Sequence, residues 1–144
     1  MIIELSTDDA EVVSQIHREC FDYGWSEKSF REMLSSDVFF GFSSEENFVE
    51  GFVLCKIVCE EIEIVTFCVL PKFRNRGVGK SLIRSVDDYA KNHSVEKIFL
   101  EVSEDNVIAQ KIYENFGYKK ISERRRYYLT PTSRKNAIIM MKTF

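Results

Sequence analysis

Apolar residues in the first third of the chain predict a short strand followed by two helices. Residues 2–5 are mostly apolar, and Thr7 or Asp8 can cap the helix that follows. Ser26 is a suitable N-cap for a second helix, after a loop at residues 21–25. The buried faces of the two helices recur at helical spacing, with Val12, Val13, Ile16 and Cys20 in the first and Phe30, Met33 and Leu34 in the second.

The pattern then changes to runs that are typical of strands. Residues 38–42 and 48–58 are largely apolar and flank a polar turn at residues 43–47. A fourth strand is predicted at residues 60–69, where polar and apolar positions alternate only loosely. We expect these central strands to form an antiparallel meander.

The second half of the chain alternates between helices and strands. Pro71 ends the fourth strand, because proline cannot donate a hydrogen bond to a ladder. Ser103 or Asp105 can cap the later of two predicted helices, and Gly117 is typical of its C-terminal end. The buried faces of these helices carry Leu82, Ile83, Val86, Tyr89 and Ala90 in the first, and Ala109, Ile112, Tyr113 and Phe116 in the second.

Further strands are predicted at residues 98–102, 118–121, 126–129 and 137–141. The order of elements therefore predicts an α/β (α+β) fold, a mixed and mostly antiparallel central sheet flanked by helices. A chain of 144 residues without repeats or linker-like segments is expected to form a single domain, residues 1–144.

Composition excludes several classes of protein. The chain is 44% hydrophobic and 30% charged, which is typical of a globular domain. Its longest apolar runs are far shorter than the roughly 20 residues that cross a bilayer, and the N-terminus lacks the pattern of a signal peptide. We therefore expect a cytoplasmic protein with no membrane partner.

Charge is distributed unevenly along the chain. Residues 1–66 carry 15 acidic and 4 basic residues, whereas residues 117–144 carry 1 acidic and 8 basic residues. An acidic surface suits a cationic substrate and a basic surface an anionic one, but two solvated faces of opposite sign explain the pattern equally well. Residues 124–128 mix cations and aromatic rings, yet nucleic-acid sites need a broader basic footprint, so no nucleic-acid contact is expected.

The four cysteines indicate no metal centre and no disulfide framework. Cys20, Cys55, Cys59 and Cys68 form no CxxC pair, and no histidine stands at a metal-binding spacing from them. Three of them lie in apolar, strand-like stretches, so reduced and buried thiols are expected.

The turn at residues 74–80 is the strongest candidate for a binding site. It joins a strand to a helix, and Gly77 and Gly79 allow a ligand to approach the backbone closely. The first N–H groups of a helix have no internal partner and attract anions, and Arg74, Arg76 and Lys80 add positive charge. A pyrophosphate fits this turn, and an ordinary strand-to-helix turn with surface cations is the alternative.

Two better-known phosphate loops do not fit these residues. A Walker A loop ending in Gly79-Lys80-Ser81 would require glycine at position 74, which is Arg74. A dinucleotide fingerprint that begins at Gly77 would require glycine at position 82, which is Leu82.

The turn resembles the acetyl-CoA signature of the GNAT N-acetyltransferases, on the residues Val69, Pro71, Arg74, Gly77 and Gly79. The resemblance implies that acetyl-CoA is the co-substrate and that no metal takes part. The pantetheine arm would pair with the preceding strand, and the backbone after it would hold the pyrophosphate. The residues implied are Phe67, Cys68, Val69, Asn75, Arg76, Gly77, Val78, Gly79 and Lys80.

The similarity runs over nearly the whole chain and narrows to the RimI type, which acetylates the N-terminal alanine of a small-subunit ribosomal protein. It rests on Trp25 to Phe30, Leu100 to Val102, Asn106, Ile112 to Tyr118, Arg125 to Tyr128 and Asn136 to Met140. The resemblance implies that the partner is the N-terminal segment of a basic protein, a ribosomal protein. Ser103, Asn136 and Pro131 depart from the pattern of that type, which concerns the choice of protein substrate more than the chemistry.

The resemblance also implies catalytic roles for two residues. Glu101 shares a strand face with Phe99, and a carboxylate among apolar neighbours has a raised pKa that suits a general base, directly or through a water. A glutamate at a strand end that simply reaches water is the alternative. Tyr113 would protonate the departing thiolate, although a packed core tyrosine is the alternative. Asn106 would either hydrogen-bond the pantetheine or only satisfy helix-start N–H groups, and a strand N–H near Cys68 or Val69 would hold the oxyanion.

Three functions remain to be separated. The first is N-terminal acetylation of a protein by direct transfer from acetyl-CoA. The second is acetylation of a small-molecule amine by an enzyme of the same family, and the third is a non-catalytic acyl-CoA-binding module. The presence of both Glu101 and Tyr113 favours an enzyme.

Overall fold

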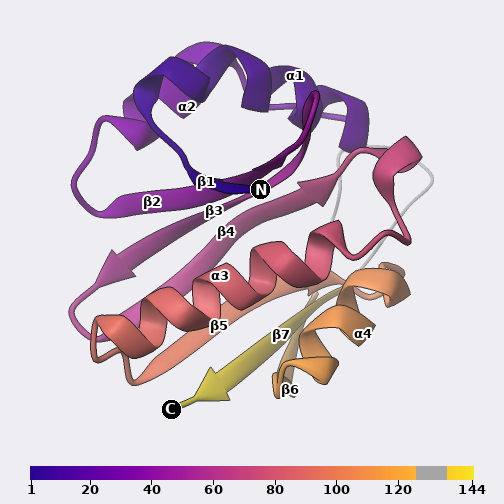
Figure 1. Ribbon diagram of the computed structural model, residues 1–144. Helices are drawn as coiled ribbons and strands as arrows, with labels where there is room; N and C mark the ends of the chain where they lie inside the picture. Colours follow the sequence, from indigo (N-terminus) through magenta and orange to yellow (C-terminus); the bar gives the residue numbers. More distant parts are fainter. Residues whose placement is uncertain (126–135) are drawn as a thin grey trace.

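The computed structural model describes residues 1–125 and 136–144, and its strands form one seven-stranded sheet of order β1-β2-β3-β4-β5-β7-β6 (Figure 1). Only β4 and β5 pair in parallel, and every other neighbouring pair is antiparallel. The predicted mixed, mostly antiparallel sheet is confirmed. The strands are β1 (Ile2–Glu4), β2 (Phe39–Glu45), β3 (Val49–Val58), β4 (Glu61–Val69), β5 (Lys97–Ser103), β6 (Lys119–Arg125) and β7 (Asn136–Thr143).

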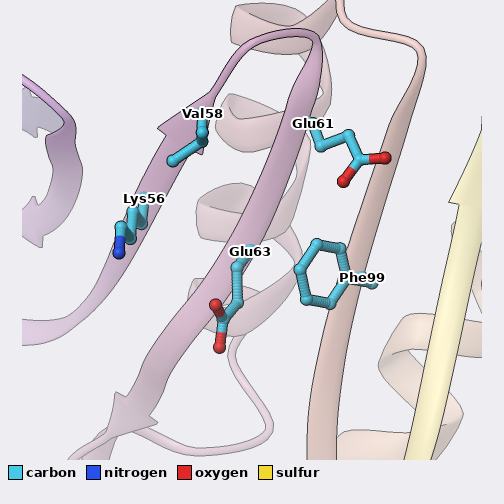
Figure 2. Close-up of a pocket in the computed structure, with 5 residues that line it drawn as sticks. All are labelled: Lys56, Val58, Glu61, Glu63 and Phe99. Atoms are coloured by element: carbon cyan, nitrogen blue, oxygen red, sulfur yellow. The ribbon is translucent and has the colours of Figure 1, made fainter.

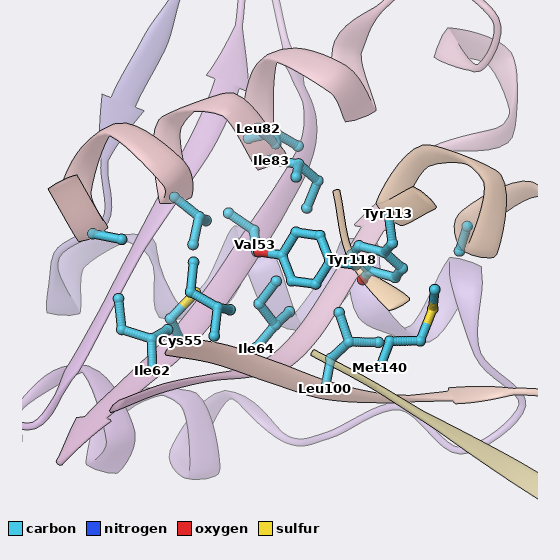
Figure 3. Close-up of a cluster of buried hydrophobic side chains, with 14 of the residues drawn as sticks. Val53, Cys55, Ile62, Ile64, Leu82, Ile83, Leu100, Tyr113, Tyr118 and Met140 are labelled. Atoms are coloured by element: carbon cyan, nitrogen blue, oxygen red, sulfur yellow. The ribbon is translucent and has the colours of Figure 1, made fainter. Parts of the chain in front are cut away.

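Helices cover both faces of this sheet. One face is covered by α1 (Ala10–Cys20) and α2 (Glu27–Leu34), and the other by α3 (Val78–Asn92) and α4 (Val107–Asn115) (Figure 1). Each pair of helices buries its own apolar cluster against the sheet. The α1/α2 cluster centres on Val13, Phe30, Phe52 and Leu54, and the α3/α4 cluster centres on Ile62, Leu82, Ile83, Leu100 and Tyr118 (Figure 3).

Three predicted details differ from the structure. Thr7 and Asp8 lie inside a short 3₁₀ turn (Thr7–Asp9), and the helix entry is held by Ser6, whose N–H donates to Asp9 Oδ2 at 2.8 Å. β2 extends to Glu45 because the serines predicted as a turn pair with both β1 and β3. Asn106, not Ser103 or Asp105, caps α4, since its Oδ1 accepts the N–H of Ala109 at 3.2 Å.

The loose alternation of β4 has a structural cause, a β-bulge at Val65. Leu54 of β3 pairs with Thr66 and Cys55 pairs with Ile64, so Val65 is an extra residue without a partner across the ladder. Because Val65 is an extra residue, odd-numbered side chains after it lie on the sheet face that even-numbered side chains occupy before it. As a result, Ile62 and Ile64 before the bulge and Phe67 and Val69 after it all pack against the α3/α4 cluster, while Cys68 joins the α1/α2 cluster.

No helix in residues 1–125 and 136–144 is long and apolar enough to cross a membrane.

Candidate active site

The two parallel strands at the centre of the sheet separate halfway along their length. Their pairing ends at Ile64 and Leu100, although β4 continues to Val69 and β5 to Ser103. Figure 1 shows the two ribbons diverging toward the end where β4 leads into α3. Backbone groups on the facing edges of these strands therefore lack the ladder partners that a closed sheet would provide.

The register shows which backbone groups of β4 face this opening. Leu70, which follows β4, donates its N–H to the carbonyl oxygen of Glu50 in β3 at 2.9 Å. Because hydrogen-bonded pairs alternate in an antiparallel ladder, Cys68 also points its N–H and C=O toward β3, whereas Phe67 and Val69 point theirs toward the opening. The backbone of Cys68 faces β3 and its side chain is buried in the α1/α2 cluster, so Phe67 and Val69 are the predicted residues of β4 whose backbone faces the opening.

The turn after β4 has the conformation that an anion site needs. Asn75 and Gly77 both have positive φ angles, of 63° and 83°, and α3 begins directly afterwards at Val78. The first N–H groups of α3 have no intrahelical acceptor, and the helix dipole favours negative charge beside them. Arg76 and Lys80 are exposed on the same turn, so their charges are available to a ligand.

The two glycines of this turn serve different purposes. A Cβ at Gly77 would meet no atom within 4 Å, so this position opens onto free space. A Cβ at Gly79 would lie 3.1 Å from Phe67 Cζ and 3.2 Å from Ile112 Cδ1. Gly77 thus supplies the left-handed backbone and an open approach, whereas Gly79 lets α3 pack closely against β4 and α4.

Glu101 lies near the end of β5, on the side of the opening across from β4. Its side chain is on the same sheet face as Phe99, as the strand alternation predicts. Arg124 of β6 donates from Nη1 to Glu101 Oε1 at 2.8 Å, and the Glu101 side chain is 27% exposed. The surroundings of the Glu101 side chain are therefore less apolar than predicted, because the guanidinium of Arg124 lies against its carboxylate.

Tyr113 approaches from the opposite face of the sheet. It is buried on α4 within the α3/α4 cluster, with its ring 5.9 Å from that of Phe67 and 5.5 Å from that of Tyr118 (Figure 3). Burial raises the pKa of the Tyr113 phenol well above its ordinary value of 10. The phenol consequently keeps its proton throughout the neutral pH range.

The loop between α1 and α2 borders the face on which Glu101 lies, and α1 fixes its conformation. The backbone N–H of Trp25 donates to His17 Nδ1 at 3.0 Å, and the backbone carbonyl of Trp25 accepts from Ser14 Oγ at 2.8 Å. The Trp25 ring also stacks on the His17 ring, with centroids 4.7 Å apart. Phe21 and Tyr23 of the same loop are exposed, so the loop presents aromatic surface in a fixed shape.

A hollow of about 100 Å³ opens on that same face, where β4 and β5 are still paired (Figure 2). Glu63 lies directly opposite Phe99 in the register, one step before the strands separate. Glu61, beside it, forms an ion pair with Lys97 at 2.8 Å. The hollow lies on the same sheet face as Glu101, farther from the opening, and is lined by two carboxylates, the Phe99 ring, Val58 and the cation of Lys56.

The described residues contain no group of three or more histidine, cysteine or acidic side chains that could hold a metal ion. Arg126 to Tyr128, which contribute to the resemblance noted in the sequence, lie outside the residues that the structure describes.

The site thus combines a sheet opened between two parallel strands, a strand-to-helix turn at the end of one, and a carboxylate and a phenol on either side. The chain belongs to the acetyltransferase (GNAT) family, whose family model matches residues 10–118. It is therefore an enzyme of the acetyltransferase class.

The relatives confirm the particular branch that the sequence resembles. The chain is 29% identical, over 140 residues, to the [ribosomal protein bS18]-alanine N-acetyltransferase of Escherichia coli K12, covering 96% of this chain and 94% of that protein. The crystal structure of the ribosomal-protein-S18-alanine N-acetyltransferase from Escherichia coli superposes with a TM-score of 0.91 at 27% identity, covering 99% and 92% of the two chains.

A more distant structure shows the same fold with a bound molecule. The acetyltransferase yncA from Salmonella typhimurium, solved with its cofactor acetyl-CoA, has a TM-score of 0.85 at 13% identity, covering 99% of this chain and 92% of that one. At this identity the likeness concerns the fold alone.

Proposed function

We propose that residues 1–144 act as one acetyl-CoA-dependent N-acetyltransferase that modifies the N-terminal α-amine of a ribosomal protein, with alanine as the first residue. One observation carries the proposal. The opening between β4 and β5 has Glu101 on one sheet face and Tyr113 on the other, so an amine and a thioester sulfur can meet between a base and an acid. A ribosomal target would place the enzyme in the cytoplasm.

Acetyl-CoA would supply an acetyl group activated as a thioester. The residues of the turn, Asn75 to Lys80, fit its pyrophosphate, because Gly77 opens onto free space and the first N–H groups of the 15-residue helix α3 lack an intrahelical acceptor. Phe67 offers its N–H and C=O along the opening to the amides of the pantetheine, and Val69 its N–H, since the Val69 carbonyl already accepts from Arg74. The amide nitrogen of Asn106 would contribute one further donor, since its oxygen already caps α4.

Glu101 would take the proton from the attacking amine, directly or through a water. An aliphatic amine is mostly protonated at neutral pH and attacks only when neutral, so a positioned base accelerates the reaction. Arg124 holds the Glu101 carboxylate by a charged hydrogen bond at Oε1 and so orients it. The N–H of Phe67 or Val69 would stabilise negative charge on the carbonyl oxygen during the transfer.

Tyr113 would hold a proton at its Oη for the departing sulfur. Its raised pKa ensures that the proton is present when it is needed. Because the acid and the base act from opposite faces, both substrates would be bound together and the acetyl group would pass directly between them. No nucleophilic residue of the chain is required to carry the acetyl group.

The acceptor would bind on the face that carries Glu101. The fixed loop around Trp25 and the hollow at Glu63 border this face, and their aromatic and acidic side chains suit a peptide with cationic residues. An enzyme for a small-molecule amine is the second candidate, because the acidic surface also suits a polyamine.

A panel of acceptors tests these alternatives. The full chain is assayed for acetyl transfer by mass spectrometry, with peptides that begin Ala-Arg, the same peptides with a blocked N-terminus, and free polyamines. We expect acetylation of the unblocked peptides alone. Transfer only to polyamines would support the second candidate, and tight acetyl-CoA binding without any transfer would support a binding module.

A further inference from the structure

Two cysteine thiols meet beside the strand that faces the opening. Cys20 is the last residue of α1 and is half-buried, whereas Cys68 lies in β4 and is only 5% exposed. Cys20 packs against the α1/α2 cluster, to which the Cys68 side chain belongs. Cys20 Sγ also donates to the carbonyl oxygen of Val69 at 3.6 Å, so the pair borders the backbone of the opening.

A cation lies against this pair. Arg74 donates from Nε to the same Val69 oxygen at 2.9 Å, which places its guanidinium next to Cys20. The hydrogen bond from Cys68, aided by the charge of Arg74, lowers the pKa of Cys20 to about 7. The same hydrogen bond, together with burial, raises the pKa of Cys68 well above its ordinary range. Cys20 therefore ionises more readily than an ordinary thiol, and Cys68 stays protonated beside it.

We propose that Cys20 and Cys68 form a redox-active dithiol, a site of reversible oxidation at the edge of the opening. The oxidant is a hydroperoxide. The Cys20 thiolate attacks the peroxide oxygen, the O–O bond breaks, and a sulfenic acid and hydroxide form. Cys68 then attacks the sulfenic sulfur, the S–OH bond breaks and a disulfide forms. The two hydroxides released in these steps take up the Cys68 proton and the proton that Cys20 lost on ionising, and leave as two waters. Overall, two thiols and one hydrogen peroxide give one disulfide and two waters.

The dithiol is also coupled to cofactor binding, an extension that rests on the proposed function. Arg74 stands at the start of the turn that would hold the pyrophosphate. A bound pyrophosphate would neutralise the charge that stabilises the Cys20 thiolate, and the thiolate fraction would fall. Acetyl-CoA should therefore slow the oxidation of Cys20.

Thiol counting on the full chain tests the dithiol itself. The reduced protein is treated with equimolar hydrogen peroxide at pH 7, unfolded, and alkylated, and the products are identified by mass spectrometry. We expect the four free thiols of the chain to fall to two, with a Cys20–Cys68 cross-link. Cys20→Ser and Cys68→Ser should form no cross-link, and Cys68→Ser should accumulate a sulfenic acid that dimedone traps. Cys59→Ser, which removes an exposed thiol, is the matched control and should oxidise like the wild type.

The outcomes separate the two parts of the inference. Four remaining thiols in the wild type, or equal thiol loss in Cys20→Ser, would overturn the dithiol, provided that circular dichroism shows a folded protein. A further measurement does not depend on disulfide formation: iodoacetamide at pH 6.5 should label Cys20 faster than the more exposed Cys59, and slower labelling would contradict the proposed thiolate. If the cross-link forms at the same rate with and without saturating acetyl-CoA, the coupling is wrong while the dithiol stands.

Discussion

Arg124 Nη1 lies 2.8 Å from Glu101 Oε1, so the proposed base of this enzyme is paired with a cation from the edge strand of the sheet. The two residues are 23 positions apart in sequence, and β7 lies between their strands. The edge strand β6 is exposed along its whole described length, yet it reaches the reaction centre through this one side chain.

Replacement of Arg124 by Gln should lower kcat/KM for the acceptor, because the Glu101 carboxylate loses the cation that orients it. The dissociation constant for acetyl-CoA, measured by calorimetry, should change little. Arg125→Gln, on the next position of the same strand, is the control and should leave kcat/KM unchanged. An unaltered kcat/KM in Arg124→Gln would show that Arg124 does not act on the proposed base.

Glu101→Gln should lower kcat by roughly 10²–10⁴-fold, the usual contribution of a general base. The dissociation constant for acetyl-CoA, measured by calorimetry, should change little, because Glu101 lies on the acceptor face. The loss should become smaller as pH rises, since more of the amine is then neutral without help. Glu63→Gln, a carboxylate on the same face, is the control; a similar loss there would point to surface charge instead of a base.

Tyr113→Phe should lower kcat by roughly 10²-fold, because the phenol proton is removed while the ring still packs. The raised pKa predicts that wild-type activity does not fall between pH 8 and 10 through ionisation of Tyr113. Tyr118→Phe removes a second buried hydroxyl next to it and should leave kcat near the wild-type value. Equal rates for Tyr113→Phe and the wild type would assign Tyr113 to packing alone.

Gly77→Asn should weaken acetyl-CoA binding by at least about 10-fold while changing stability by less than about 1 kcal/mol. Asparagine tolerates the left-handed backbone, and the added side chain would stand in the open space expected to hold the pyrophosphate. Gly117→Asn is the matched control, because Gly117 also has a positive φ, of 94°, but ends α4 elsewhere. Calorimetric titration of both variants with acetyl-CoA measures the difference, and intact binding by Gly77→Asn would refute the assigned turn.

His17 should make the protein less stable at acidic pH. Burial lowers the pKa of His17 from 6.5 to about 4, so the unfolded chain takes up a proton more readily than the folded one. The stabilisation is complete above pH 6.5 and is lost as pH falls toward 4, by about 2 kcal/mol. Urea unfolding at pH 7.5 and 4.5 measures this loss. It should be smaller in His17→Gln and unchanged in His93→Gln, which replaces an exposed histidine; an equal loss in all three proteins would contradict the assignment.

Local patterns in the sequence predict most of the sheet and helices of this protein. Apolar spacing indicates α1, α2, α3 and α4, and Ser26 is the predicted cap that the structure confirms, at the start of α2. The glycine-containing turn is recognisable because its conformation is local. The alternation in β5 also predicts the face on which Glu101 lies. Each of these features depends on neighbours within a few residues.

The features that sequence reasoning missed depend on contacts between distant segments. Arg124 reaches Glu101 only because β7 inserts between β5 and β6, an order that no local pattern encodes. The hydrogen bond from the Trp25 backbone N–H to His17 forms only because α1 packs beside the loop that follows it. The bulge at Val65 did leave a signal, the break in alternation within residues 60–69, but only the register with β3 identifies the extra residue.

The bulge has a consequence for how this gene can change over time. Val65 has no partner across the ladder, so its substitution leaves the pairing on either side intact. Loss of its codon would also keep the register, because Ile64 and Thr66 already pair with neighbouring residues of β3. A codon inserted between Thr66 and Phe67 would instead exchange the faces of Phe67 and Cys68 and turn the Phe67 amide away from the opening. Among related sequences, position 65 should therefore vary in residue type and in presence, whereas residues 66–69 should resist insertions and deletions.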